Sequence, residues 1–382
     1  MKPTRKGFVS MKKIITMIMV VCLLLCACSK APAEQTTDAV PNTTDAIVTT
    51  EDTKATEATQ ATEETTVPAA TEETVPVILY RNPLNGTPLD EPHTARPYAV
   101  VINNIVYAQP LCGVGSADIV IELLAEGGIT RCLAIFDDIK GLEHIGAVRS
   151  ARPYFVELAS SFDAIFVHHG GSVDGYNRVR ELGITHLDFL GNAGSSYYRD
   201  QNRLNSGYDL EHTSFTDGDD LLERVAELEY ETDREGGVDY GCVFGDVGST
   251  ADGENAAEMK VVFGSKTTTL IYDETTGLYT AMQYGDNIID GNTDELVTYR
   301  NMLMLTTETY TYENNDGVRV HMDLVGEGSG YFACDGKIVP ICWSRSGDYE
   351  PFVFTHEDGT PIVLGTGSTY IAITPLDGIL EY

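Results

Sequence analysis

The amino-acid composition changes near residue 79, and this change confines any packed core to the part of the chain that follows. Residues 29–79 consist mainly of Thr, Ala, Glu, Val and Pro and contain almost no aromatic side chains. Such a segment buries too little apolar surface to offset the entropy lost on ordering. We therefore expect a disordered, acidic tether over residues 28–79. The following residues, 80–382, suffice for one large domain or two ordinary ones.

The first residues have the pattern of an export signal. Lysines and arginines, with no acidic residue among them, precede an apolar stretch over residues 14–25 that is too short to span a bilayer comfortably. This stretch ends in Leu25-Cys26-Ala27-Cys28, which resembles a bacterial lipobox. We expect residues 1–27 to be a cleaved signal peptide and Cys28 to carry a lipid. The protein would then sit on the extracytoplasmic face of the bacterial cell membrane. An ordinary signal peptide ending near a cysteine is the alternative.

Charge and motif content exclude several classes of function. The formal net charge is -33, from 25 Lys and Arg against 58 Asp and Glu. Such a surface repels nucleic acid, which binds through cationic patches, so no nucleic-acid partner is expected. The sequence contains no zinc-protease motif, nucleophile elbow, phosphate loop or dinucleotide fingerprint. Its cysteines form no Cys-x-x-Cys pair. We therefore expect no metal and no cofactor.

Alternating strand and helix signals follow the tether. Glu126-Gly127-Gly128 is a turn signal between two of the apolar runs, which indicates a hairpin. Pro153 is typical of the first position of a helix, and Gly183 of the residue that closes one. The predicted strands span residues 96–104, 117–124, 129–136 and 164–168, and the predicted helices 153–162, 173–182 and 219–229.

The pattern changes after about residue 255. Short runs rich in Tyr, Val, Ile and Thr are separated by the pairs Thr276-Gly277, Asp316-Gly317, Asp335-Gly336 and Asp358-Gly359. Pairs of this kind between alternating segments indicate hairpins. The predicted fold class is therefore α+β, with an α/β domain and a mixed sheet over residues 80–235. An antiparallel, β-rich C-terminal domain is expected over residues 255–382.

Several blocks of sequence resemble one known family. They are Pro-Leu-Asn-Gly at 83–86, Arg-Pro-Tyr-Ala-Val-Val-Ile-Asn-Asn at 96–104, Gly-Ala-Val-Arg-Ser-Ala-Arg-Pro-Tyr at 146–154 and Gly-Lys-Ile-Val-Pro-Ile-Cys-Trp at 336–343. Together they are similar to the YerB-type bacterial lipoproteins. The resemblance covers nearly all of residues 80–382 and departs from the family pattern at Cys112 and Cys132. It implies a two-domain extracytoplasmic lipoprotein of Gram-positive bacteria, and no reaction is implied.

The block at 146–154 also contains a candidate anion site. Arg149 and Arg152 stand directly before the helix predicted to begin at Pro153. A helix N-terminus carries free N–H groups and partial positive charge, and arginine adds paired donors suited to phosphate, sulfate or carboxylate. The alternative is that both arginines pair with internal carboxylates, such as Glu122, Glu126 or Asp163.

Two adjacent histidines end the strand predicted at 164–168. Because side chains alternate along a strand, His168 and His169 should point to opposite sides. One would then face the mouth of the sheet while the other packs inside. The following Gly170-Gly171 would let backbone N–H groups approach a ligand, although such pairs are also common in plain turns.

Further charged side chains belong to the same candidate cleft. Glu122 lies within an apolar run and needs a partner. Either it forms a salt bridge with an arginine (Arg131, Arg149 or Arg152), or it acts as a general base or metal ligand. Glu126 and Arg131 flank the turn and are candidate ligand-binding residues. His212 precedes a polar loop and could reach the same cleft.

Three functions remain open on this basis. The leading hypothesis is a non-enzymatic binding or assembly protein of the cell envelope, with an anion- or glycan-receiving cleft around Arg149, Arg152, His168 and His169. The second is an envelope hydrolase or transferase acting on phosphorylated or glycosylated polymer, in which Glu122 or His168 handles the proton. The third is a scaffold that binds a protein partner.

Overall fold

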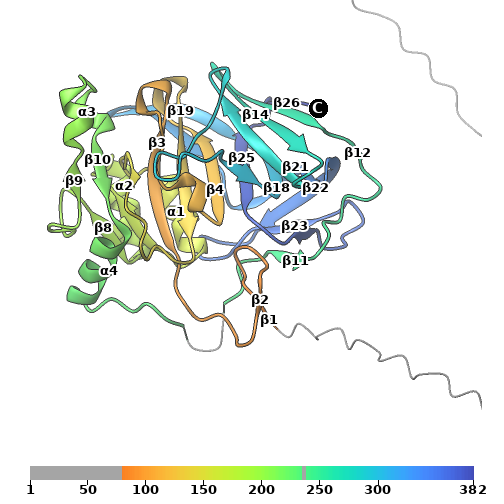
Figure 1. Cartoon of the computed structure of the whole chain (residues 1–382), viewed down its shortest axis with the longest axis horizontal. Helices are drawn as coiled ribbons and strands as arrows, with labels where there is room; N and C mark the ends of the chain where they lie inside the picture. The colour runs from red at the N-terminus through yellow and green to blue at the C-terminus, as the bar shows by residue number, and fades with distance from the viewer. Residues whose placement is uncertain (1–79, 235–237) are drawn as a thin grey trace, which may run out of the picture. The chain divides into compact units, whose positions relative to one another are not determined.

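A long mixed sheet organises residues 80–234 and 238–382, which the computed structural model describes (Figure 1). The predicted signal peptide, the tether and Cys28 lie outside these residues. The sheet has 11 strands. In spatial order they are β12 (Glu254–Asn255), β22 (Lys337–Arg345), β21 (Gly326–Cys334), β18 (Asn301–Thr307), β25 (Thr369–Pro375), β4 (Ile119–Leu124), β5 (Thr130–Phe136), β3 (Tyr98–Asn104), β7 (Ile165–His168) and β8 (His186–Asp188), with β23 (Val353–Thr355) paired to β22.

The two halves of the chain meet within this sheet. β25 comes from the C-terminal end of the chain and pairs in parallel with β18 on one side and with β4 on the other. β4, β5 and β3 are antiparallel, whereas β3, β7 and β8 are parallel. The α+β class with a mixed N-terminal sheet is thus confirmed. The C-terminal ladders are antiparallel except at β18–β25 and β11–β24.

Different elements cover the two faces of the sheet. Helices α1 (Pro153–Ser161) and α2 (Val173–Leu182) contribute to the core on one face. Helix α4 (Gly218–Glu227) contributes to the core on the other face. There it is joined by a second sheet of β16 (Asp286–Asn287), β15 (Leu278–Gln283), β14 (Lys266–Asp273), β13 (Glu258–Phe263), β26 (Ile379–Glu381) and β17 (Thr298–Tyr299).

Local sequence signals explain where the helices begin and end. Pro153 occupies the first turn of α1, as predicted. The Ser172 hydroxyl caps α2 by accepting a hydrogen bond from the Gly175 N–H group, and Gly183 ends that helix in the left-handed region at φ 60°. The predicted turn at 126–128 joins β4 to β5. None of the helices in the two described stretches is both long and apolar enough to cross a bilayer.

Short elements complete the described residues. One three-stranded sheet, in the order β6-β10-β9, lies beside the main sheet and positions the candidate site. Its strands are β6 (Ile145–Gly146), β10 (Ser214–Thr216) and β9 (Tyr198–Arg199), and helix α3 (Gln201–Asn205) follows β9. The remaining pairs are β1 (Tyr80–Arg81) with β2 (Pro88–Leu89), β11 (Val243–Gly245) with β24 (Val363–Gly365), and the hairpin of β19 (Thr309–Asn314) with β20 (Gly317–Met322).

Candidate functional site

Residues from four strand ends line an open pocket of about 250 Å³, which we call the anion pocket. Arg149 follows β6, His169 follows β7, Arg199 ends β9 and Ser214 begins β10. Ser214 is paired directly opposite Arg199 in the small sheet. The backbone N–H of His169 donates to the Arg149 carbonyl at 2.9 Å. This ladder of main-chain bonds holds the polar side chains around one space.

Arg199 carries the least compensated charge in the anion pocket. Its guanidinium donates to the Leu210 carbonyl at 2.6 Å and to Nε2 of His169 at 3.1 Å. No carboxylate among the described residues forms an ion pair with it, although acidic residues far outnumber basic ones in this chain. A cation left without a carboxylate in so acidic a protein is available for an external anion.

His169 is a neutral imidazole of defined tautomer. Burial, followed by the positive charge of Arg199, lowers the pKa of His169 to about 4. Because the Arg199 guanidinium can only donate, Nε2 of His169 must accept and the proton lies on Nδ1. Nδ1 therefore donates to the Ser214 hydroxyl oxygen at 2.6 Å. The Ser214 O–H group remains free to donate to a ligand.

Arg149 is held by a carboxylate that faces solvent. Its guanidinium donates to the Glu211 carboxylate at 2.9 Å and to the Glu211 carbonyl at 3.2 Å. The Glu211 side chain is 51% exposed, so its contribution to this ion pair is weakened by water. An anion entering the pocket would compete with Glu211 for Arg149.

Arg152 and Arg131 do not line the anion pocket. Arg152 forms a paired contact with Glu126, through Nη2 at 2.9 Å and through Nε. Burial alone would raise the pKa of Glu126, but the hydrogen bonds and charge of Arg152 outweigh it and lower that pKa. Arg131 is buried and donates to the Ser150 carbonyl at 3.1 Å. The expectation that Arg149 and Arg152 share one cleft is therefore corrected, because Arg152 satisfies an internal carboxylate.

His168 packs against Phe166 and His186, whereas the His169 ring lies against Phe189 and Tyr197, so the two rings have different surroundings, as the alternation predicts. Burial lowers the pKa of His168 to about 4. One ring nitrogen bonds the Gly170 carbonyl at 2.8 Å, and the other lies 3.0 Å from Nδ1 of His186. With no exposed surface, His168 cannot touch a ligand here. The Gly170 N–H is likewise used internally, since it donates to the Asp188 carboxylate at 2.8 Å.

Glu122 is also fully buried and lies away from the anion pocket. Its carboxylate accepts from Nζ of Lys266 at 2.8 Å and from the Tyr370 hydroxyl at 2.7 Å. Burial alone would raise the pKa of Glu122, but the charge and hydrogen bond of Lys266 outweigh it and lower that pKa. Its ion-pair partner is thus Lys266 and not an arginine, because β14 packs against the face of the sheet to which Glu122 points.

His212 lies beside the anion pocket and not in it. Its ring is buried, and Nδ1 lies 2.9 Å from the Asn103 amide nitrogen. The same residue lines a neighbouring pocket with Tyr107 and Tyr208. Within residues 80–234 and 238–382, no cluster of three or more His, Cys, Asp or Glu side chains is arranged to hold a metal ion.

Sequence reasoning missed Arg199, Ser214 and Glu211. Arg199 follows Tyr197-Tyr198 in a stretch without an apolar run. The sequence therefore predicted no strand there, and Arg199 was not identified as a residue at a strand end. Glu211 precedes His212, and only the histidine was a candidate site residue. The one sequence signal for Arg199 was its position beside two tyrosines in a strongly acidic chain.

Comparisons with known proteins agree with this fold. The model of the protein of unknown function (DUF3048) N-terminal domain matches residues 84–231, and that of the DUF3048 C-terminal domain matches residues 259–371. YerB of Bacillus subtilis (strain 168), whose name carries the word lipoprotein, is 32% identical over 302 residues, or 77% of this chain and 86% of that protein. The chain belongs to this YerB-type, two-domain family.

A solved structure of the family has the same architecture. The crystal structure of YerB protein from Bacillus subtilis superposes with a TM-score of 0.69 at 29% sequence identity. The match covers 79% of this chain and 99% of that chain. The resemblance noted from the sequence blocks at 96–104 and 146–154 is therefore confirmed. Neither family description names a ligand or reaction, so the chemistry of the site has to be argued from its side chains.

Proposed function

We propose that this protein is a non-enzymatic binding protein of the cell envelope whose anion pocket receives an anionic group of an envelope polymer. The observation that carries the proposal is Arg199, a guanidinium with no carboxylate partner in residues 80–234 and 238–382, beside Arg149 and the neutral ring of His169. Charge-assisted hydrogen bonds from arginine are strong and suit phosphate or carboxylate oxygens. The free Ser214 O–H supplies a further donor.

The state of His169 favours binding over hydrolysis. A nucleophilic serine needs an adjacent general base that accepts its proton, most often a histidine nitrogen. Here Nδ1 of His169 donates to Ser214, and Nε2 is occupied by Arg199. The other candidates for proton transfer, Glu122 and His168, have no exposed surface. The alternative of an envelope hydrolase or transferase would therefore have to use Glu211, an exposed carboxylate of this pocket that accepts a hydrogen bond from Arg149, as its general base.

We also propose that the protein is anchored to the extracytoplasmic face of the membrane through a lipid on Cys28. The lipobox-like sequence and the lipoprotein name of the Bacillus relative support this placement. Replacing Cys28 by alanine should move the protein from the membrane fraction of the producing cells to a soluble fraction. Continued membrane attachment of that variant would contradict the anchor.

Replacing Arg199 by glutamine is expected to weaken the binding of inorganic phosphate by at least about tenfold, since charged hydrogen bonds contribute roughly 1.5–3 kcal/mol. Calorimetry measures the affinity. In the unaltered protein, NMR should also show the pKa of His169 rising from about 4 on phosphate binding, because a nearby anion favours the imidazolium.

Two further variants make this test specific. Arg180→Gln is the matched control, since Arg180 is exposed on α2, outside the anion pocket, and has no carboxylate partner among the described residues. It should leave phosphate binding unchanged. Glu211→Gln should tighten binding, because it releases Arg149 from a competing carboxylate. Equal affinities for the Arg199→Gln and Arg180→Gln variants would reject the proposed function.

A further inference from the structure

Two more hollows lie beyond the anion pocket, one next to it and one farther along. The first, the tyrosine pocket, measures about 320 Å³ and is lined by Tyr107, Tyr208, Asp209 and His212 among others. The second, the amide pocket, measures about 290 Å³, and its lining includes Gln109, Gln283, Tyr284 and Asn287. Neither contains a lysine or arginine. The three pockets together are far larger than a single phosphate or carboxylate group requires.

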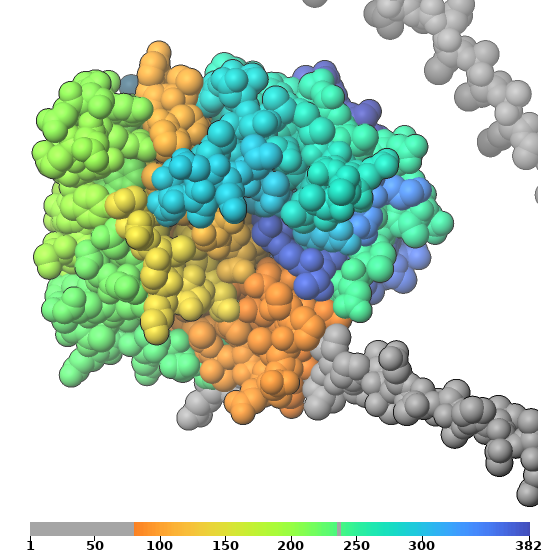
Figure 2. All heavy atoms as spheres, viewed as in Figure 1, coloured from red at the N-terminus to blue at the C-terminus, as the bar shows by residue number. Residues whose placement is uncertain are grey.

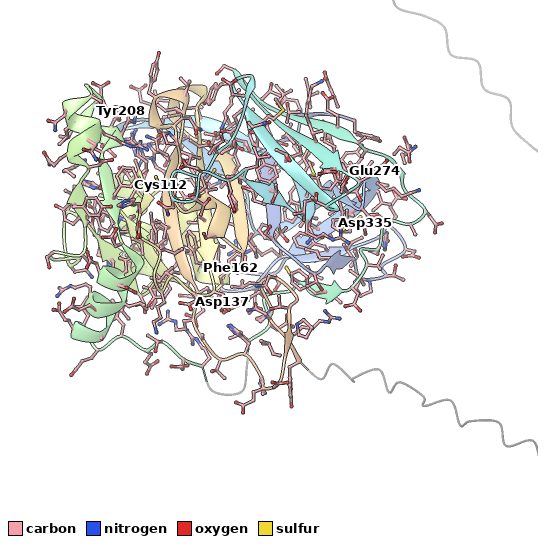
Figure 3. The ribbon with its side chains drawn as sticks, viewed as in Figure 1. Cys112, Asp137, Phe162, Tyr208, Glu274 and Asp335 are labelled. Atoms are coloured by element: carbon pink, nitrogen blue, oxygen red, sulfur yellow. The ribbon has the colours of Figure 1, made fainter. Side chains whose placement is uncertain are left out.

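The pockets lie in a row, because neighbouring pockets are lined by the same turn or by the same residue. Leu210 and Glu211 line the anion pocket, while Asp209 and His212 of the same turn line the tyrosine pocket. Val106 lines both the tyrosine and the amide pocket. In Figure 2 the turn that follows β3 (orange, upper edge) stands between the green atoms around α3 and the blue-green atoms of the second sheet. Tyr208 follows α3 on one side of this turn (Figure 3).

The chemistry of the lining changes along the row. Among the residues that line the three pockets, Arg149 and Arg199 of the anion pocket are the cationic ones. Next to it, Tyr107 is 72% exposed, and its side chain makes no hydrogen bond to any residue that the structure describes. Tyrosine is enriched at binding interfaces because it combines an apolar ring with a polar hydroxyl group.

The amide pocket contains unsatisfied hydrogen-bonding atoms. The Gln283 side chain is only 6% exposed, and its Nε2 donates to the Thr268 hydroxyl at 3.1 Å. Its Oε1 has no partner, and Nε2 of Gln109 has none either. Buried polar groups normally have partners, so an orphaned acceptor and an orphaned donor in one pocket call for a ligand or water. A hydroxyl group both donates and accepts, so a ligand hydroxyl is suited to either atom.

We propose that these three pockets form one extended surface that binds a glycan chain carrying an anionic substituent. The substituent occupies the anion pocket, a sugar ring packs against Tyr107, and hydroxyl groups of a further unit bond Gln109 and Gln283. Asp209 and Asp286 flank the outer pockets and disfavour a second negative charge there. The inference rests on the proposed anion-binding function and adds the class of ligand.

The experiment compares three probes by calorimetry: inorganic phosphate, glucose 1-phosphate, and maltohexaose phosphorylated at its reducing end. Linked contacts raise affinity because the second binding event becomes intramolecular, and we expect the phosphorylated hexasaccharide to bind at least about tenfold more tightly than glucose 1-phosphate. Tyr107→Ser should remove most of that gain and leave phosphate binding unchanged. Tyr310→Ser, at an exposed tyrosine of β19 that lines none of the three pockets, is the matched control.

The outcomes separate this inference from the proposed function. If phosphate binds through Arg199 but the phosphorylated hexasaccharide binds no more tightly than glucose 1-phosphate, the extended surface is rejected. The proposed anion-binding function is then retained. If a phosphoserine hexapeptide binds as tightly as the phosphorylated hexasaccharide and loses affinity equally in Tyr107→Ser, the ligand is a peptide and the glycan assignment is wrong. If no phosphorylated probe binds, both proposals fail. Because Tyr107 is mostly exposed, its replacement should leave thermal unfolding unchanged.

Discussion

Replacing Lys266 by methionine is expected to lower the free energy of unfolding by about 3–5 kcal/mol, the usual loss when one partner of a buried ion pair is removed. Glu122 has no exposed surface, and Lys266 supplies its one positive charge among the described residues at 2.8 Å. Without the ammonium group, the native state holds an unpaired carboxylate or must protonate it. Either outcome costs stability.

The position of this ion pair makes the loss large. Nζ of Lys266 also donates to the Thr130 hydroxyl at 2.9 Å and to the Asn104 carbonyl at 3.2 Å. Glu122 belongs to β4, and Lys266 begins β14 of the second sheet. The contact therefore ties the N-terminal half of the chain to the C-terminal half. Chemical denaturation followed by circular dichroism measures the effect.

Two variants test the cause of this loss. Lys337→Met removes a lysine whose ammonium, within the part of the chain that the structure describes, bonds only the Gly253 carbonyl at 3.3 Å, and it should cost much less. The double variant Glu122→Gln with Lys266→Met removes both charges and should recover part of the stability lost in Lys266→Met. A double variant no more stable than Lys266→Met would show that packing, rather than the unpaired charge, dominates.

Acidification from pH 6.5 to about pH 4 is expected to destabilise the protein by roughly 3 kcal/mol through His168 alone. Burial lowers the pKa of His168 from 6.5 to about 4 in the folded protein. Between these two pH values the unfolded chain binds the proton and the native state does not. Stability therefore rises with pH across this window, and this contribution is complete above pH 6.5.

The variant His168→Asn isolates this contribution. Asparagine does not titrate, and its amide can replace the donor to the Gly170 carbonyl. The variant should be less stable at pH 7 because the smaller side chain leaves a cavity, yet its stability should fall less steeply between pH 6.5 and 4. An unchanged slope in His168→Asn would contradict the burial argument.

Local signals in the sequence predicted the elements well. The helix beginning at Pro153, the helix closed by Gly183 and the hairpin around 126–128 all occur where residue type and periodicity indicated. The Asp316-Gly317 and Asp335-Gly336 hairpins are confirmed in the same way. These features depend on backbone preferences within a few residues, so they can be read without knowledge of the fold.

The candidate site was only partly predictable. Alternation correctly separated His168 from His169, because it is a property of one strand. The ion-pair partners of Glu122 and Arg152 could not be assigned from the sequence. Several cations could pair with Glu122, and many carboxylates could pair with Arg152. Arg199 was missed because its role arises from β9 lying beside β10, which brings it next to a histidine 30 positions away.

The sequence by itself predicted that the core begins after residue 79, and it determined that the class is α+β and that the chain belongs with the YerB-type proteins. Each follows from composition, periodicity or contiguous motifs. Only the tertiary structure decided that β25 inserts between β18 and β4, that Lys266 neutralises Glu122, and that Arg199 joins Arg149 and His169 in one pocket. The physical reason is that periodicity marks which side chains are buried, whereas the order of strands in the sheet selects their partners.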